Sequence, residues 1–161
     1  MPPTISLRNS KTSDLKYFLR WWKDKELIAL TSGYQEKSDA KLKSYFDAMM
    51  ASSRDHHYMI VVNSRTVGHI ALTHRDADSF EIHIVIGNKR YWGKGLGTRA
   101  IKKALSIAFG KFKYHQAYLE VRPDNLRAIK AYEKCGFVRG RLKQYPNNKY
   151  QPVVLVMRLK G

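Results

Sequence analysis

A glycine-rich turn between an apolar strand and an amphipathic helix is the feature that most restricts the fold of this chain. Residues 79–86 alternate as a half-buried strand does, and the segment after Gly97 repeats apolar residues at helical spacing to near Gly110. Between them, residues 90–98 read Arg-Tyr-Trp-Gly-Lys-Gly-Leu-Gly-Thr. Backbone N–H groups and a helix N-terminus converge on one point in such a unit, which therefore predicts an anion-binding site.

Two well-known phosphate-binding motifs do not fit this turn. A P-loop has four residues between its first glycine and its Gly-Lys pair, whereas five separate Gly87 from Gly93-Lys94. A dinucleotide-binding turn requires an acidic residue about 20 positions further on, and the residues around position 113 include neither Asp nor Glu. The turn is therefore either another kind of anion site or a tight connection with a purely structural role.

The rest of the chain alternates between strand and helix patterns. Alternation and β-rich runs predict strands at 4–8, 58–62, 66–72, 117–121 and 153–159, with a hairpin turn at 63–65 and one more strand before the turn at 146–148. Apolar spacing predicts helices that begin at Ser13, Ser38 and Asn125. With the unit described above, this order predicts a single α/β (α+β) domain over residues 1–161. Its sheet would be mixed and seven-stranded, flanked by four helices.

The chain carries a large positive charge, with 30 Lys and Arg against 13 Asp and Glu and a formal net charge of +17. Such a field attracts nucleic acid, a ribosomal surface, an acidic peptide or the phosphates of a nucleotide cofactor; an ordinary solvated basic surface is the other interpretation. The single cysteine, Cys135, and the absence of HExxH spacing among six histidines predict no disulfide and no metal. No secretory signal or membrane span is recognisable, so we expect a cytoplasmic protein that does not enter a membrane.

Two motifs, in order, resemble those of the GNAT superfamily of N-acetyltransferases. Arg90-x-x-Gly93-x-Gly95 is similar to its pyrophosphate-binding signature, which is Gln or Arg, two residues, Gly, any residue, then Gly or Ala. A wider string, Glu-Ile-His-Ile-Val-Ile-Gly-Asn-Lys-Arg-Tyr-Trp-Gly-Lys-Gly-Leu-Gly-Thr at 81–98, is followed by Asn-Leu-Arg-Ala-Ile-Lys-Ala-Tyr-Glu-Lys-Cys-Gly-Phe at 125–137. Together they resemble the branch that acetylates ribosomal-protein N-termini, polyamines and aminosugars. The two motifs cover roughly residues 79–140.

The resemblance implies the acyl-CoA N-acyltransferase fold, with a mostly antiparallel sheet. Acetyl-CoA would be the co-substrate, held where two parallel strands splay apart. The pantetheine arm would pair with the strand before the glycine turn, and the pyrophosphate would lie on the N–H groups of the turn. The residues that the resemblance assigns to the cofactor are Ile84, Val85, Ile86, Arg90, Trp92, Gly93, Lys94, Gly95, Leu96, Gly97, Thr98, Asn125, Ala128 and Tyr132.

The implied chemistry is direct attack of an amine on a thioester, which needs a base, a polarised carbonyl and a proton for the thiolate. Tyr132 occupies the family's general-acid position; a core aromatic is the alternative. Glu81 matches the acidic position, and strand alternation places His83 on the same face, so either residue could be the base, or both could form an exposed surface pair. The backbone N–H near Val85 is assigned to the oxyanion.

The acceptor is the open question at this stage. Trp21, Trp22 and Tyr34 border the loop that lines the acceptor site in the family, although Trp22 also lies on the apolar helical face and is expected in the core. The net charge favours a protein or peptide N-terminus over a polyamine or aminoglycoside, which would need a locally acidic pocket. A basic nucleic-acid or ribosome-binding module without enzymatic activity, or an inactive CoA sensor, remains a rival. Either a monomer or a homodimer is compatible with the sequence.

Overall fold

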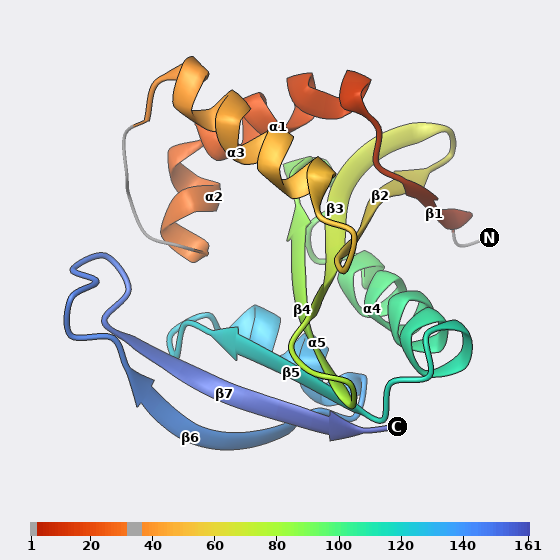
Figure 1. Ribbon diagram of the computed structural model, residues 1–161, viewed down its shortest axis with the longest axis vertical. Coiled ribbons are helices and arrows are strands. Elements are labelled where there is room, and N and C mark those ends of the chain that lie inside the picture. Colours follow the sequence, from red (N-terminus) through yellow and green to blue (C-terminus); the bar gives the residue numbers. More distant parts are fainter. Residues whose placement is uncertain (1–2, 32–36) are drawn as a thin grey trace.

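A single seven-stranded sheet organises the computed structural model, which describes residues 3–31 and 37–161 (Figure 1). Tyr34 lies outside the described residues. The strands are β1 (Ile5–Asn9), β2 (His56–Val62), β3 (Arg65–His74), β4 (Ser79–Ile86), β5 (Gln116–Val121), β6 (Val138–Gln144) and β7 (Val153–Lys160). Their order is β1-β2-β3-β4-β5-β7-β6, and every neighbouring pair is antiparallel except β4 and β5. The predicted mixed, mostly antiparallel sheet is confirmed.

The described residues form five α-helices, one more than the sequence predicted. They are α1 (Leu15–Trp22), α2 (Lys25–Leu30), α3 (Asp39–Ala51), α4 (Leu96–Ser106) and α5 (Leu126–Lys134), and a π-helical turn, Ile107–Lys111, continues α4. The additional helix is α2, whose six residues are too few to show a helical period. Its start is nevertheless marked, because the Asp24 carboxylate accepts hydrogen bonds from the backbone of Glu26 and Leu27.

The predicted helix starts are confirmed at two of three positions. The Ser38 hydroxyl accepts a hydrogen bond from the Lys41 N–H, and the Asn125 side chain accepts one from the Ala128 N–H. The start at Ser13 is wrong. A 3-10 turn occupies Thr12–Asp14 and α1 begins after it, with Asp14 and not Ser13 as the residue before the helix. The buried Asp14 carboxylate pairs with Arg8 at 2.7 Å and accepts from the Lys11 N–H at 2.9 Å.

The sheet separates two hydrophobic clusters. Phe80 and Ile82 of β4 belong to the larger cluster, which includes α4 and α5 side chains, whereas Val85 packs against the smaller cluster around Phe18 and Trp21. The predicted alternation of β4 is thereby confirmed. Trp22 was expected in the core, but Trp21 is the buried tryptophan of α1 and Trp22 is only partly buried. Figure 1 shows α1, α2 and α3 grouped on one side of the sheet, away from α4 and α5.

Gly87 follows β4 directly and lies against the indole of Trp21. A Cβ at this position would overlap the indole ring, which is 6% exposed and held among core side chains. We expect Gly87→Ala to lower the free energy of unfolding by about 1–3 kcal/mol, because overpacking displaces the ring. Gly110→Ala is the control, since a Cβ there meets no atom within 4 Å. Urea unfolding measures both; equal stabilities would contradict the prediction.

Candidate active site

The parallel strands β4 and β5 pair only at one end. Residues Ser79, Phe80 and Glu81 are in register with Gln116, Ala117 and Tyr118, and no further pair follows. β4 stays paired with β3 as far as Ile86, so its edge toward β5 is left without a strand partner over residues 82–86. Figure 1 shows the two strands diverging from this point. The expected splay is confirmed, and it leaves backbone groups of β4 open to a ligand.

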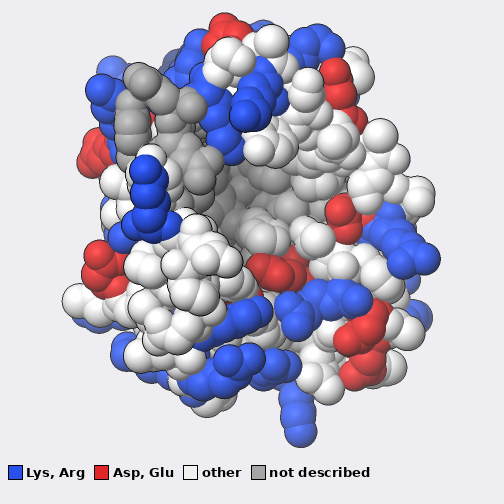
Figure 2. All heavy atoms as spheres, turned by 60° about the vertical axis from the view of Figure 1, so that its left-hand side comes forward, with Lys and Arg blue, Asp and Glu red and all other residues white. Residues whose placement is uncertain are grey.

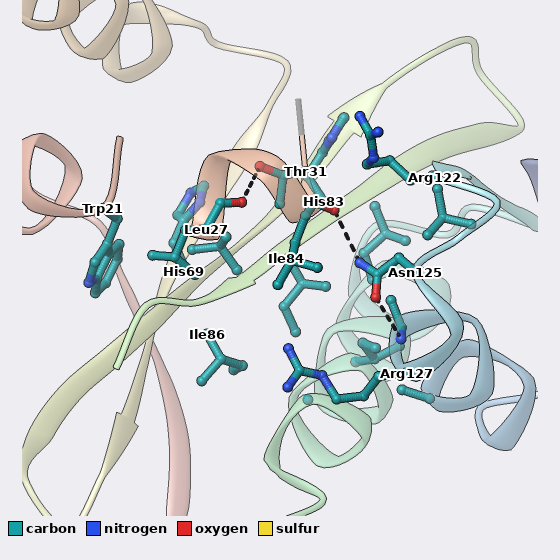
Figure 3. Close-up of a pocket in the computed structure, with 18 of the residues that line it drawn as sticks. Trp21, Leu27, Thr31, His69, His83, Ile84, Ile86, Arg122, Asn125 and Arg127 are labelled. Atoms are coloured by element: carbon teal, nitrogen blue, oxygen red, sulfur yellow. Dashed lines mark hydrogen bonds between the residues drawn. The ribbon is translucent and has the colours of Figure 1, made fainter. Parts of the chain in front are cut away.

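A cavity of about 1040 Å³ lies at this gap and is lined by residues from both faces of the sheet. Most predicted site residues line it: Glu81, His83, Ile84, Val85, Ile86, Trp92, Gly93, Gly95, Leu96, Gly97, Thr98, Asn125, Ala128 and Tyr132. Figure 3 shows Ile84, Ile86, Asn125 and Arg127 around the same space. Arg90 and Lys94 are exposed and are not among the lining residues. Leu96 is 1% exposed and belongs to the larger part of the core as well as to the cavity lining.

The glycine turn has the geometry of an anion site. Gly93 and Gly95 have φ values of 72° and 75°, which favour glycine, and Gly95 is the residue immediately before α4. A Cβ placed at Gly93, Gly95 or Gly97 would meet no protein atom within 4 Å. The space beside these glycines is therefore open, and all three line the cavity, so a phosphate could approach their backbone. The Trp92 indole N–H donates to the Ile86 carbonyl at 2.7 Å and anchors the turn to the end of β4.

Asn125 joins the start of α5 to the end of α2. Its amide oxygen accepts from the Ala128 N–H at 3.3 Å, and its amide nitrogen donates to the Leu30 carbonyl at 3.1 Å (Figure 3). Arg127 lies beside it, with its guanidinium 4.2 Å from the centre of the Trp92 ring. Sequence reasoning missed Arg127, because an exposed arginine on a helix gives no sign of what lies opposite it.

Tyr132 is packed in the core and also faces the cavity, so its position fits both a core aromatic and a general acid. It is 8% exposed, with its ring 5.9 Å from that of Phe137, yet it also lines the cavity. Burial raises the pKa of its phenol to about 12, and the nearby Cys135 acts in the same direction. The hydroxyl is therefore protonated at neutral pH, as a proton donor must be.

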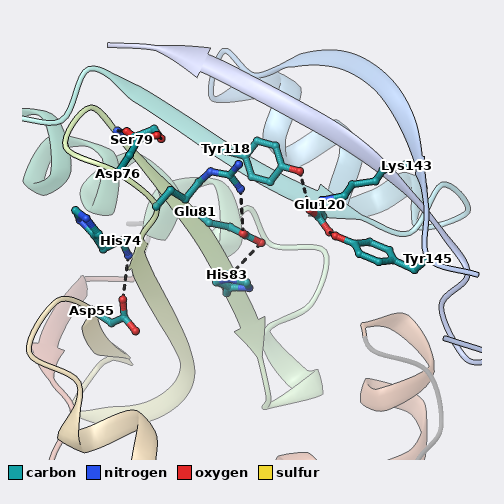
Figure 4. Close-up of polar contacts among 11 residues, drawn as sticks. Asp55, His74, Asp76, Ser79, Glu81, His83, Tyr118, Glu120, Lys143 and Tyr145 are labelled. Carbon is teal, nitrogen blue, oxygen red and sulfur yellow. Dashed lines mark hydrogen bonds and ion pairs between the residues drawn. The ribbon is translucent and has the colours of Figure 1, made fainter. Parts of the chain in front are cut away.

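Glu81 lies where β4 and β5 part, with Arg75 and His83 each 3.5 Å from its carboxylate oxygens (Figure 4). Its side chain is 21% exposed, against 53% for His83. Burial raises the pKa of Glu81 above its ordinary value; Glu120 acts in the same direction, while His83, Arg75 and Lys143 oppose it. The pKa of the Glu81 carboxylate is thus shifted toward neutral pH, as suits a general base.

Glu120 on β5 is a second carboxylate in the cavity, and sequence reasoning missed it. Its two oxygens accept hydrogen bonds of 2.6 Å from the hydroxyls of Tyr118 and Tyr145, and Lys143 lies 3.4 Å away (Figure 4). Burial raises its pKa, but these three partners outweigh burial and hold the pKa below its ordinary value. The alternation of β5 could have predicted that Tyr118 and Glu120 share one face.

His69 lines the cavity on the α1–α3 side and adds no positive charge to it. Burial lowers the pKa of His69 to about 3, and its Nε2 lies 3.0 Å from Nδ1 of His57, so His69 is neutral at physiological pH. Figure 2 shows a hollow on this face with an acidic patch at its edge, and the acidic residues that line the cavity are Glu81 and Glu120.

Within the described residues, no group of three or more His, Cys, Asp or Glu is arranged to hold a metal ion, and no helix is long and apolar enough to cross a membrane.

The chain is similar in sequence to several known N-acetyltransferases. The chain is 27% identical to spermidine N(1)-acetyltransferase of Escherichia coli K12, over 94% of this chain and 83% of that protein. It is 26% identical to aminoglycoside N(6')-acetyltransferase type 1 of Klebsiella pneumoniae, over 76% of this chain and 64% of that protein. A shorter match is N-alpha-acetyltransferase RimI of Mycobacterium tuberculosis, 28% identical over 62% of each chain. The resemblance to the ribosomal-protein branch is therefore not specifically supported.

A solved structure and a family model complete the comparison. The crystal structure of spermidine N-acetyltransferase from Vibrio cholerae, in complex with CoA and spermine, superposes on this chain with a TM-score of 0.83. The match covers 97% of this chain and 95% of that one at 22% sequence identity, so it supports the fold alone. The model of the acetyltransferase (GNAT) domain matches residues 4–138. With the splayed strands and the glycine turn, this match shows that the chain belongs to the GNAT acetyltransferase family and is an acetyl-CoA-dependent N-acetyltransferase.

Proposed function

We propose that this enzyme acetylates a primary amine of a small, multiply charged cation such as a polyamine. The observation that carries the proposal is the pair of carboxylates, Glu81 and Glu120, in the cavity of a chain whose net charge is +17. The preference for a peptide N-terminus assumed that no locally acidic pocket exists. The two carboxylates supply acidic groups in the cavity, although each has a basic neighbour, Arg75 at 3.5 Å from Glu81 and Lys143 at 3.4 Å from Glu120. The spermidine acetyltransferases among the relatives support the same substrate class.

The donor half of the site is proposed to lie on the α4–α5 face. The pyrophosphate would bind the open N–H groups of Gly93 to Thr98, and the pantetheine arm would pair with the free edge of β4 at 84–86. Arg127 would supply positive charge beside the turn, where the exposed Arg90 and Lys94 do not line the cavity.

The proposed reaction uses groups of β4, β5 and α5. The ammonium loses a proton to Glu81, and the neutral amine attacks the thioester carbonyl carbon, so that a C–N bond forms and the C–S bond breaks. The carbonyl oxygen, negative in the intermediate, would accept from the backbone N–H near Val85. Tyr132 then protonates the departing thiolate, and the proton that the new amide nitrogen loses restores the phenol, while Glu81 releases its proton to solvent. Glu120, held ionised by its tyrosine partners, would bind a second ammonium of the substrate.

A peptide or protein N-terminus is the second candidate, and the basic surface favours it. Thirty Lys and Arg side chains would attract an acidic protein or a ribosomal surface, although no described feature identifies such a partner. Family membership sets aside the binding module without enzymatic activity. The cytoplasmic location and the choice between monomer and homodimer stay predictions from the sequence.

The deciding experiment measures CoA thiol release from acetyl-CoA with a panel of acceptors. The panel contains spermidine, an aminoglycoside, and peptides that begin with alanine or serine. We expect kcat/KM for spermidine to exceed that for the peptides by about 100-fold, because each peptide presents one amine to a site with two carboxylates. Turnover with the peptides alone would overturn the small-cation proposal in favour of an N-terminal acetyltransferase.

A further inference from the structure

Two histidines are hydrogen-bonded to each other on the α1–α3 side of the sheet. Nδ1 of His57 lies 3.0 Å from Nε2 of His69, and the two rings are within 9° of parallel. His69 also makes a T-shaped contact with Phe18, 4.8 Å between ring centres, and it lines the cavity. Among the described residues, none is hydrogen-bonded to Nδ1 of His69, so this ring nitrogen is left for a ligand in the cavity.

The register of the sheet places His69 beside the proposed reaction centre. His69 of β3 lies opposite Val85 of β4, and facing side chains of an antiparallel pair point to the same side with Cβ atoms about 5 Å apart. The backbone N–H near Val85 is the group proposed to receive the negative oxygen of the intermediate. Figure 3 shows His69 and Ile84 among the residues around the same cavity. An amine that attacks the carbonyl from the α1–α3 side therefore passes within reach of the His69 ring.

The far end of the histidine pair bears on which nitrogen of His69 carries hydrogen. Burial lowers the pKa of both rings, so both are neutral at physiological pH, and a neutral imidazole has one donor and one acceptor nitrogen. Nε2 of His57 and the hydroxyl of Ser10 are buried, and neither has a hydrogen-bond partner among the described residues. The two residues lie opposite each other, since the Ser10 N–H donates to the His57 carbonyl at 2.9 Å.

A hydrogen bond between these two groups would fix the tautomer of the whole row. An unpaired buried polar atom costs about 1–3 kcal/mol, so His57 and Ser10 are favoured as partners, directly or through one water. When His57 donates from Nε2 to the Ser10 hydroxyl, its Nδ1 must accept from Nε2 of His69. Nδ1 of His69 then carries a lone pair and no hydrogen.

We infer that His69 binds and orients the attacking amine: its Nδ1 accepts a hydrogen bond from the amine, so that the lone pair of the amine faces the thioester carbonyl. His57 and Ser10 are positioning residues, because they hold His69 in the tautomer that accepts. The opposite tautomer would present an N–H to the amine. His69 gains and loses no proton, since Glu81 is the proposed base. The inference rests on the proposed reaction centre at Val85 and holds for any primary amine.

Two replacements of His69 separate the roles of its nitrogens. An asparagine amide reaches the place of Nδ1, and a glutamine amide reaches that of Nε2. We expect His69→Gln to lower kcat/KM for the amine about 10- to 100-fold, because the amine loses a hydrogen bond that orients it. His69→Asn should stay within about fivefold of wild type, and the KM for acetyl-CoA should change less than about threefold in both. His56→Gln is the control, since His56 stacks on Phe112 and does not line the cavity.

The tautomer is measured in the wild-type protein by NMR of nitrogen-15-labelled histidine at neutral pH. We expect hydrogen on Nε2 of both His57 and His69. Ser10→Ala should increase the fraction with hydrogen on Nδ1 and lower kcat/KM for the amine about 2- to 10-fold. Because the first measurement needs no substitution, it decides the inference even if a variant of His69 fails to fold.

The other outcomes separate the inference from the proposed substrate class. Hydrogen on Nδ1 of His69 in wild type overturns the inference, and so does wild-type kcat/KM in a folded His69→Gln. Equal losses in His69→Asn and His69→Gln overturn the assignment to Nδ1. Turnover of peptides but not of spermidine overturns the small-cation proposal alone, because the variants of His69 are then compared with a peptide as the amine. Failure of wild type to acetylate any amine overturns both.

Discussion

Replacing Tyr132 by phenylalanine is expected to lower kcat about 100-fold or more while changing the KM for acetyl-CoA by less than about threefold. The phenylalanine ring keeps the contact with Phe137, so only the proton donor is lost. Because burial raises the pKa of the phenol to about 12, wild type should retain its donor throughout the alkaline range up to about pH 10. Steady-state kinetics at saturating amine measures kcat.

Tyr114→Phe is the matched control for this experiment. Tyr114 is also buried, and its hydroxyl lies 2.7 Å from Nδ1 of His74, away from the residues that line the cavity. Loss of that hydroxyl should leave kcat unchanged. If Tyr132→Phe folds with the thermal stability of wild type and turns over at the wild-type rate, Tyr132 is a core aromatic and another group protonates the thiolate.

The parts of the site that local pattern determines could be predicted from the sequence. The alternation of β4 separates Glu81 from Ile82 whatever the rest of the chain does, and two positive φ values explain why Gly93 and Gly95 stand where they do. The cap at Asn125 is equally local, since its partner is three residues away. The positions of the strands along the chain followed from the same periods.

What could not be predicted depends on contacts between distant segments. Glu120 is held ionised partly because Tyr145, 25 residues later and directly after the edge strand β6, donates a hydrogen bond to it. Arg127 gains its position from Trp92, on the opposite side of the gap. The charge of +17 describes the whole surface and could not reveal that the cavity carries two carboxylates, and this is why sequence reasoning favoured a different acceptor.

Replacing Glu81 by glutamine is expected to lower kcat/KM about 100- to 1000-fold, because the amine then reaches the thioester as an ammonium. The carboxylate works as a base only when it is deprotonated. Burial raises the pKa of Glu81, so activity of the wild type should rise with pH through a value above the ordinary pKa of an exposed glutamate. That acid limb should vanish in Glu81→Gln. The pH profile of kcat/KM is the measurement.

Two neighbouring substitutions should move the acid limb in opposite directions. Glu120→Gln removes a negative charge that raises the pKa of Glu81, so the limb shifts to lower pH, even if weaker amine binding also lowers the whole profile. His83→Gln removes a neighbour that lowers this pKa, so the limb shifts to higher pH with kcat reduced by less than about tenfold. Loss of the limb in His83→Gln and its survival in Glu81→Gln would instead make His83 the base. The opposed shifts are diagnostic because a merely structural role for Glu120 or His83 would lower the profile without displacing it.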